Sequence, residues 1–170
     1  MQDYNEFQLG KTNVLVPLES MEQHRLATQQ MVQQCRRSVH IISRDLDPAV
    51  YDLPEFTGAL TRRLLEHRRM KVYILVHDAH AIARAGHRLL GTALKMSGFV
   101  EIRKPGPDHK DYDGGMFVGD GAGFITRRSA DRYVGQMNFN DPRDAKVLLD
   151  EFEEMWAKST ADANLRKFVI

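Results

Sequence analysis

The stretch Lys71–Val76, with the sequence KVYILV, constrains the fold of this chain more than any other feature. Its apolar side chains follow one another almost without polar interruption, a pattern typical of a β-strand covered on both faces. Such a strand lies inside a sheet that carries helices on both sides. The neighbouring segments repeat the arrangement, since strand–helix units recur three times before about residue 104. The sequence therefore predicts an α/β fold, with a mixed β-sheet flanked by helices.

Hydrophobic periodicity places the individual elements along the chain. Short apolar runs predict strands at 14–16, where Pro17 ends the run, and at 39–42, 71–76 and 99–103. Apolar residues at helical spacing predict helices at about 20–37, from 52–54 through Leu64, and at about 81–96. Residues 104–115 contain two prolines and three glycines, so we expect a loop there.

The closing part of the chain combines a hairpin, a further strand and an amphipathic helix. The runs 116–118 and 124–126 are joined through Asp120 and Gly121, a pair suited to the positive φ angles of a tight turn. The next run is 133–139, and Asp141 followed by Pro142 is typical of a helix N-terminus. One face of this helix carries Ala145, Leu148, Leu149, Phe152, Met155 and Trp156. We expect at least the hairpin to lie in the sheet.

This closing part resembles phospholipase D-like domains. In those domains one strand carries a histidine, a lysine two residues on and an aspartate five further along, and a Gly-Ser-x-Asn segment follows the next strand. Here Asp120 matches the aspartate, whereas Asp113 stands at the histidine position and Gly115 at the lysine position. The Gly-Ser-x-Asn positions hold Arg127, Arg128, Ser129 and Ala130. The resemblance implies a phospholipase D-like fold with a degenerate motif, and it makes the loop 104–115 a wall of the cleft.

The resemblance also implies a reaction, phosphodiester cleavage through a phosphohistidine, with a cation on the phosphoryl oxygens. Asp113 supplies no imidazole and Gly115 no side chain. We therefore interpret the chain as a non-catalytic domain, from a bacterial family, that serves assembly or binds an anionic ligand. Single-copy domains of this superfamily pair about a two-fold axis. We accordingly expect a homodimer, or packing against another domain of a longer parent chain.

Arg127, Arg128 and Ser129 form the candidate anion-binding group. Guanidinium forks suit phosphate, so a small phosphate-like anion is the expected ligand. A weak nucleic-acid-binding module is a further alternative, which predicts salt-sensitive binding through the two arginines. A net charge of +1 and 8% aromatic residues give that alternative little support. The basic pairs at 62–63 and 68–69 are interpreted as the solvated face of a helix, paired with Glu66 and its neighbours.

His77, His80 and His87 offer a different alternative, a divergent phosphodiesterase or other hydrolase with or without a metal ion. They follow the strand 71–76, and ligands in open α/β sheets gather past the carboxyl ends of strands. His80 and His87 are seven residues apart, about two helical turns, which is farther than one metal ion bridges without another segment. The plainer interpretation is a histidine-rich helix start with Asp78 as N-cap, and no cofactor is expected.

Length and composition fit one domain that spans residues 1–170, of which 1–12 are polar and expected to be flexible. The single Cys35 excludes an internal disulfide and favours a reducing compartment. No apolar run approaches the roughly 20 residues that span a bilayer. The N-terminus also lacks the basic and apolar segments of a signal peptide. We therefore expect a cytoplasmic protein without membrane insertion.

Overall fold

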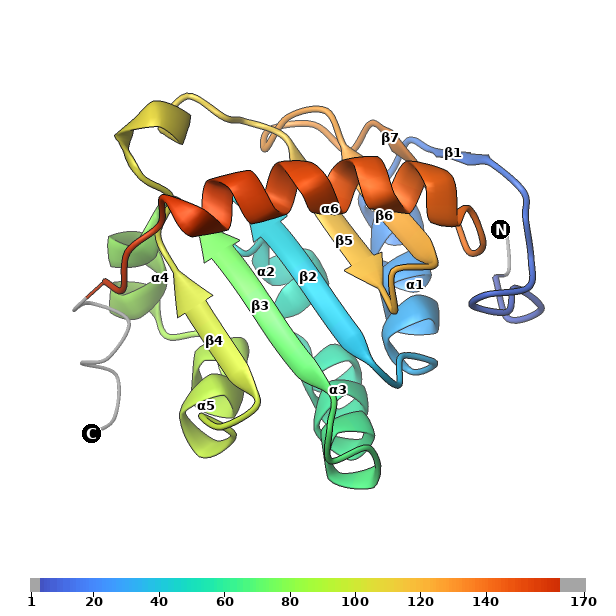
Figure 1. Cartoon of the computed structure of the whole chain (residues 1–170), viewed down its shortest axis with the longest axis horizontal. Coiled ribbons are helices and arrows are strands. Elements are labelled where there is room, and N and C mark those ends of the chain that lie inside the picture. Colours follow the sequence, from blue (N-terminus) through green and yellow to red (C-terminus); the bar gives the residue numbers. More distant parts are fainter. Residues whose placement is uncertain (1–3, 163–170) are drawn as a thin grey trace.

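A seven-stranded mixed sheet forms the centre of the computed structural model, which describes residues 4–162 of the chain (Figure 1). The strands follow the order β1-β7-β6-β5-β2-β3-β4 across the sheet. Their bounds are β1 (Val16–Leu18), β2 (Ser38–Ser43), β3 (Lys71–Val76), β4 (Val100–Arg103), β5 (Gly115–Gly119), β6 (Gly123–Arg127) and β7 (Gly135–Asn138).

The sheet has a parallel part and an antiparallel part. Strands β2, β3 and β4 run parallel, with Ile41 opposite Ile74. Strand β5 joins β2 from the other side in the antiparallel sense, with Ile42 opposite Met116. Strands β5, β6 and β7 form an antiparallel meander, and β1 pairs with β7 at the edge. The α/β fold with a mixed sheet, predicted from the sequence, is confirmed.

Helices cover both faces of this sheet (Figure 1). One face packs against α1 (Met21–Val32), α2 (Pro48–Tyr51), α3 (Pro54–Glu66) and α5 (Arg88–Lys95), and the other against α6 (Pro142–Ala157). The short helices α4 (Ala79–Ala85) and η1 (Pro107–His109) lie in the connections that follow β3 and β4.

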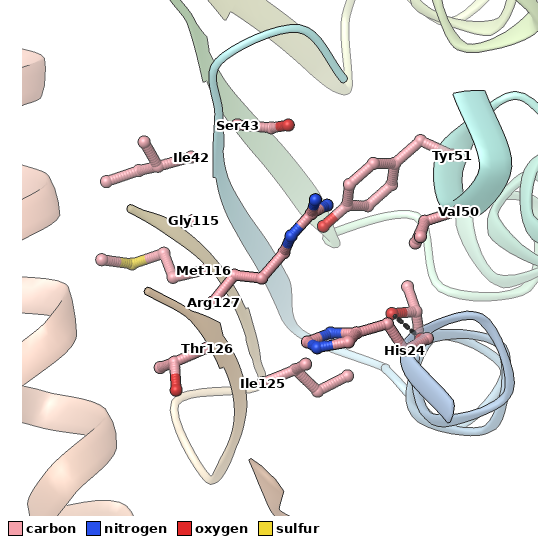
Figure 2. A pocket seen from close by; sticks show the side chains of 11 residues that line it. His24, Ile42, Ser43, Val50, Tyr51, Gly115, Met116, Ile125, Thr126 and Arg127 are labelled. Carbon is pink, nitrogen blue, oxygen red and sulfur yellow. Dashed lines mark hydrogen bonds between the residues drawn. The ribbon is translucent and has the colours of Figure 1, made fainter. Parts of the chain in front are cut away.

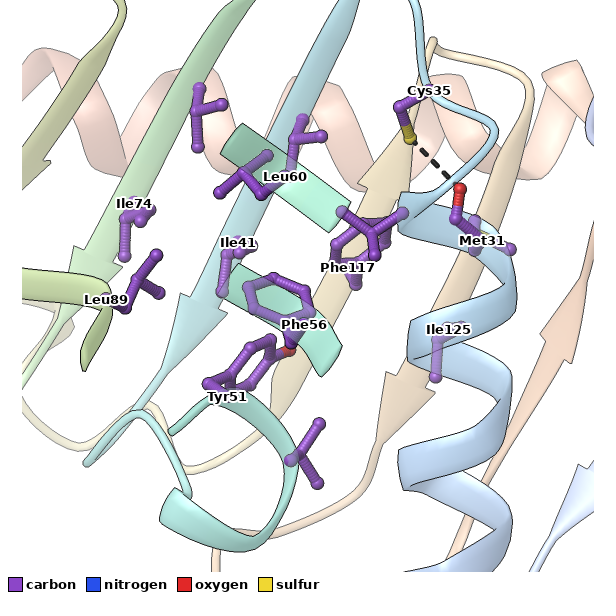
Figure 3. Packing of buried hydrophobic residues seen from close by; sticks show 14 of the residues in the cluster. Met31, Cys35, Ile41, Tyr51, Phe56, Leu60, Ile74, Leu89, Phe117 and Ile125 are labelled. Carbon is purple, nitrogen blue, oxygen red and sulfur yellow. Dashed lines mark hydrogen bonds between the residues drawn. The ribbon is translucent and has the colours of Figure 1, made fainter. Parts of the chain in front are cut away.

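Two hydrophobic cores fill the spaces between the sheet and its helices. Ile41 and Ile74 belong to the larger core, whereas the next residues along the same strands, Ile42 and Leu75, belong to the core beneath α6. Successive side chains of a strand point to opposite faces, so both strands are buried on both sides. This explains the nearly continuous apolar run in β3. Figure 3 shows the larger core, which includes Met31, Tyr51, Phe56, Leu60, Leu89, Phe117 and Ile125.

Helix α6 follows its sequence prediction closely. The Asp141 side chain accepts a hydrogen bond from the Asp144 amide at 3.1 Å, and Pro142 opens the first turn. All six residues of the predicted apolar face pack against the sheet, three of them fully buried: Ala145, Phe152 and Met155. The helix start and its packing face are both confirmed.

Several other boundaries differ from the predictions. The first strand is Val16–Leu18 and includes Pro17, which an edge strand tolerates because one side of its backbone needs no ladder hydrogen bond. A single helix at 81–96 is wrong, because Gly86, with φ of 80°, separates α4 from α5. Helix α1 ends at Val32, earlier than expected, and α2 was not foreseen.

The N-terminal segment and Cys35 both pack against the domain. Tyr4 is buried, and the Gly10 amide donates to the Phe139 carbonyl at 2.8 Å. Burial raises the pKa of the Cys35 thiol well above its usual value, which makes it a poor nucleophile. Within residues 4–162, the helices are too short or too polar for any of them to cross a membrane.

Candidate functional site

The candidate site lies where the central strands β2 and β3 end. We call this region the carboxyl edge, defined as the last residues of β2, β3 and β6, the first residue of β5, and the residues that adjoin these strand ends. Because β5 is antiparallel to β2, its first residue, Gly115, lies near the end of β2 and pairs with Arg127 at the end of β6. Two of the three positions of the phospholipase D-like motif, Asp113 and Gly115, therefore lie here, beside Arg127 of the candidate anion-binding group.

Asp113, at the histidine position, forms an ion pair with the residue that follows β2. Arg44 Nε donates to Asp113 Oδ1 at 3.0 Å, and Arg44 Nη2 donates to the Tyr112 carbonyl at 3.2 Å. The Asp113 side chain is about half exposed. Its charge is thus balanced within the chain, on the surface of the carboxyl edge.

Gly115, at the lysine position, has room for a side chain. A Cβ there would lie 3.4 Å from the Ile42 carbonyl oxygen and 3.5 Å from Arg127 Cβ, which are ordinary van der Waals distances. Backbone crowding therefore does not require the glycine. The cross-strand neighbour of this position is Arg127, at the end of β6.

The Arg127 guanidinium forms its hydrogen bonds with other residues of the domain. Its Nη1 donates to Asp47 Oδ2 at 2.7 Å, and the two side chains are only 14% and 10% exposed. Nε and Nη2 donate to the carbonyls of Arg132 and Ala130, at 2.9 and 2.7 Å. The guanidinium also stacks on the Tyr133 ring, 4.3 Å from its centroid. The arginine is therefore bound on every nitrogen.

A histidine that the sequence analysis missed lies beside this ion pair. His24, on α1, is 3% exposed, and within the described residues its Nε2 has no hydrogen-bond partner. Burial, and next the charge of Arg127, lower the pKa of His24 to about 4, so the ring is neutral at pH 7. Figure 2 shows the Arg127 guanidinium between the His24 imidazole and the Tyr51 ring. No motif marks His24, because a single histidine on a helix has no diagnostic spacing.

The space between these side chains is small. His24, Ser43, Tyr51, Gly115 and Arg127 are among the residues that line a cavity of about 30 Å³. A water molecule occupies about that volume in the liquid, whereas a phosphodiester needs several times more. The space between these side chains is therefore too small to enclose a bulky substrate.

Asp120, the third motif residue, lies at the far end of β5. Its carboxylate accepts hydrogen bonds from the backbone amides of Arg36, Arg37 and Ser38, the shortest of them 2.7 Å long. Asp120 and Gly121 adopt the positive φ angles expected for the hairpin turn, 56° and 66°. Asp120 fastens this turn to the start of β2, a structural role at the opposite end of the strand from Asp113 and Gly115.

The three histidines proposed as metal ligands have separate environments. His77 Nε2 lies 3.0 Å from the His109 carbonyl oxygen. His87 is buried, with Nε2 2.8 Å from the Leu46 carbonyl oxygen and Nδ1 accepting from the Leu89 amide, while His80 is exposed. Among residues 4–162, no three potential ligands gather around one point. Asp78 caps α4 through the Ala81 amide at 3.3 Å, as the plainer interpretation expected.

The remaining candidate anion-binding residues point away from the buried ion pair. Arg128 is exposed, and its backbone amide donates to the Val134 carbonyl at 3.0 Å. Ser129 Oγ donates to Asp131 Oδ1 at 2.7 Å. The structure therefore separates the three: Arg127 is internal, Arg128 faces solvent and Ser129 binds a carboxylate. Anion binding at this group stays a prediction.

Comparisons with known proteins agree with this fold. A family model described as a domain of unknown function, DUF7931, matches residues 20–168. The search of curated proteins gives no match. Among solved structures, Nuc from Salmonella typhimurium, a phospholipase D family member, superposes with a TM-score of 0.59 at 13% identity, over 86% of this chain and 96% of that one. NucT from Helicobacter pylori gives 0.60 at 12% identity, over 88% and 98%.

A larger protein also contains this fold. TrmBL2, described as an archaeal chromatin protein with a novel mode of DNA binding, has a TM-score of 0.64 at 14% identity. The similarity covers 89% of this chain and 55% of TrmBL2, so the chain spans little more than half of that protein's length. At such low identities these similarities establish the phospholipase D fold and nothing finer.

Proposed function

We propose that this chain, which belongs to the DUF7931 family of domains of unknown function, is a non-catalytic phospholipase D-like domain. Its fold is that of the phospholipase D family members Nuc and NucT. We propose that the carboxyl edge now belongs to the structural framework of the domain. The domain then acts by assembly or by binding an anionic ligand.

The observation that carries the proposal is the internal pairing of charge at the carboxyl edge. A phosphohistidine mechanism needs a free imidazole and a free cation around one phosphate. Asp113 is paired with Arg44, Gly115 has no side chain, and Arg127 is bound to Asp47. The cavity between these side chains is small, about 30 Å³.

The test is a turnover assay with a chromogenic phosphodiester, with and without a chelator, beside an active phosphodiesterase as positive control. We expect no turnover above the buffer rate. Turnover that survives the chelator and disappears in His24→Ala would show a working site at the carboxyl edge, contrary to the proposal. Turnover that is lost with the chelator and in His77→Ala/His80→Ala would instead support the metal-assisted hydrolase.

The proposed assembly has its own measurement. We propose that two copies pair about a two-fold axis, as the phospholipase D resemblance implies, or that the domain packs on another domain of a longer protein. Light scattering on the purified chain distinguishes the two, because a homodimer has twice the chain mass of 19.5 kDa. A monomeric mass at micromolar protein concentrations would contradict the homodimer and leave packing against another domain as the proposed assembly.

A further inference from the structure

The opposite end of the central strands carries a cluster of basic side chains. We call it the amino edge, defined as the turns that precede β2 and β3, the β5–β6 turn, and the N-terminal segment beside them. The Lys71 amide donates to the Arg37 carbonyl at 3.3 Å, so the two turns lie side by side. The cations of this edge are Lys11, Arg36, Arg37, Arg68, Arg69 and Lys71.

Four of these six side chains have no ion pair, hydrogen bond or ring contact with residues 4–162. Lys11, Arg36, Arg37 and Arg69 are exposed, and within residues 4–162 their side chains form no ion pair and no hydrogen bond. Arg68 lies over the Phe99 ring, 5.5 Å from its centroid. The donors of the first four are therefore open to solvent, unlike those of Lys71, whose Nζ donates to the Gly98 carbonyl at 2.6 Å.

The acidic residues on the same turns do not balance these cations. Asp120 accepts hydrogen bonds from the backbone amides of Arg36 and Arg37, and so leaves their side chains free. Glu66 pairs with Arg63 at 3.2 Å, on α3 itself. The basic pair 68–69, interpreted from the sequence as part of a helix face paired with Glu66, instead follows the end of α3 at Glu66.

The helix dipoles do not account for the cluster either. Helices α1 and α3 both end near this edge, and a helix C-terminus favours cations within its last turn. Helix α3 already has Arg63 in that turn. Arg36, Arg37, Arg68 and Arg69 lie beyond the last helical residues, Val32 and Glu66. The helix dipoles act within the last turn and therefore do not explain these four arginines.

The amino edge is also hollowed. Lys11, Arg36, Arg37 and His67 line a groove of about 570 Å³, whereas the cavity at the carboxyl edge has only about 30 Å³. Asp120 lies in the same groove and holds the start of β2 in place. The groove therefore has a fixed backbone and exposed, positively charged side chains, an arrangement suited to several phosphates in a row.

The N-terminal wall of this groove is held by hydrogen bonds as well. The Leu9 amide donates to Gln34 Oε1 at 2.7 Å, and the Gly10 amide donates to the Phe139 carbonyl at 2.8 Å. These contacts fix the segment that carries Lys11. A partner at the amino edge would therefore meet cations from three separate segments without first ordering the backbone, which lowers the entropic cost of binding.

We propose that the amino edge binds the phosphate backbone of duplex nucleic acid without reading its sequence. Cations spread over adjacent turns suit a chain of phosphates better than one small anion. Phe99, beside the turn that precedes β3, has the cations of Arg68 and Lys71 over its ring, so this ring is not free to stack on an unpaired base. This inference does not rest on the loss of catalysis, because the two edges are at opposite ends of the sheet.

Fluorescence anisotropy with a labelled 20-base-pair DNA duplex tests the proposal on the full chain. At 50 mM salt we expect Arg36→Gln/Arg37→Gln and Arg68→Gln/Arg69→Gln each to weaken binding about tenfold or more. Each lost phosphate contact makes the slope of log K against log salt less negative by about 0.9, so each double variant should change it by nearly two. The matched control is Lys104→Gln/Lys110→Gln, which removes two exposed cations outside the amino edge and should change the affinity less than twofold.

Several outcomes would overturn the proposal. One is that the wild-type chain does not bind the duplex at 50 mM salt. Another is that the control pair weakens binding as much as the arginine pairs do. A loss caused by Arg128→Gln alone would move the anion site to the carboxyl edge. Binding to vesicles that contain phosphatidylserine, with no binding to DNA, would make the partner a membrane. Circular dichroism and thermal melting of each variant establish that it is folded.

Discussion

The two ends of the central strands use charged residues in opposite ways. At the carboxyl edge, Arg127 and Asp47 are largely buried and paired at 2.7 Å, and the cavity beside them has only about 30 Å³. At the amino edge, Arg36 and Arg37 are exposed and leave their donors free above a groove of about 570 Å³. Both ends belong to the same strands and the same fold.

This difference implies that charged residues stabilise the domain at the carboxyl edge and recognise a partner at the amino edge. A buried ion pair has already lost its water, so removing one partner leaves an unpaired charge and destabilises the domain strongly. An exposed arginine keeps its water, so its removal changes stability little but removes a contact for a partner. The carboxyl edge should therefore respond to mutation as a structural core, and the amino edge as a binding surface.

The largest expected effect is at the buried ion pair. Arg127→Met should lower the free energy of unfolding by about 3–5 kcal/mol, because Asp47 is left buried without its partner. Urea denaturation at pH 7 measures the loss. Arg36→Met, at the amino edge, is the matched control and should stay within about 0.5 kcal/mol of the wild type.

A double variant sharpens this result. Arg127→Met/Asp47→Leu removes both charges and should recover much of the lost stability, since an apolar pair of similar volume often replaces a buried ion pair without loss. The recovery should fall short by about 1 kcal/mol, because Asp47 Oδ1 also caps α2 through the Ala49 amide at 3.0 Å. A loss below 1 kcal/mol in Arg127→Met would contradict the contrast between the edges.

The pH dependence of stability gives the next effect. Burial lowers the pKa of both His24 and His40 to about 4, while an unfolded histidine titrates near 6.5. The unfolded chain therefore binds more protons between these values, and the free energy of unfolding falls as the pH decreases from 6.5 towards 4. The total loss is up to about 3 kcal/mol for each ring.

Urea titrations between pH 7 and 4.5 measure this slope. His24→Leu should flatten it, because the buried ring no longer titrates, and the remaining slope should come from His40 and from His77, whose pKa burial also lowers. Arg128→Gln, an exposed change on the same edge, should leave the slope as in the wild type. An unchanged slope in His24→Leu would mean that His24 reaches solvent, and so that the carboxyl edge opens.

Sequence patterns predicted most of the fold because a buried helix or strand leaves a periodic pattern of apolar residues in its own sequence. The run 71–76, the hairpin turn at Asp120 and the cap at Asp141 all follow from neighbouring residues, and all are confirmed. The pairing of β1 with β7 was not foreseen, because Val16 meets Met137 only through tertiary contact. The break at Gly86 was missed because apolar spacing continues across it.

The site was less accessible to sequence analysis, for a physical reason. The phospholipase D resemblance located Asp113, Gly115 and Arg127 along the chain, but their partners come from distant segments. Asp47 meets Arg127 across 80 residues, and His24 reaches the same place from α1. Periodicity predicts which face of a helix or strand a residue lies on, but it does not predict which charged residue from another segment will contact it. Internal pairing, the feature that distinguishes the two edges, therefore became visible only in the fold.

The smallest expected effect is at the surface of the carboxyl edge, where Arg44 pairs with Asp113 at 3.0 Å. The two side chains are 37% and 50% exposed, so water screens their attraction. A double-mutant cycle of Arg44→Gln and Asp113→Asn, followed by urea denaturation, should give a coupling energy below about 1 kcal/mol. A coupling above about 2 kcal/mol would show that this pair behaves like the buried one, which would extend the closed structure to the rim of the cleft. A small coupling would instead show that burial, rather than position at the carboxyl edge, decides which ion pairs hold this domain together.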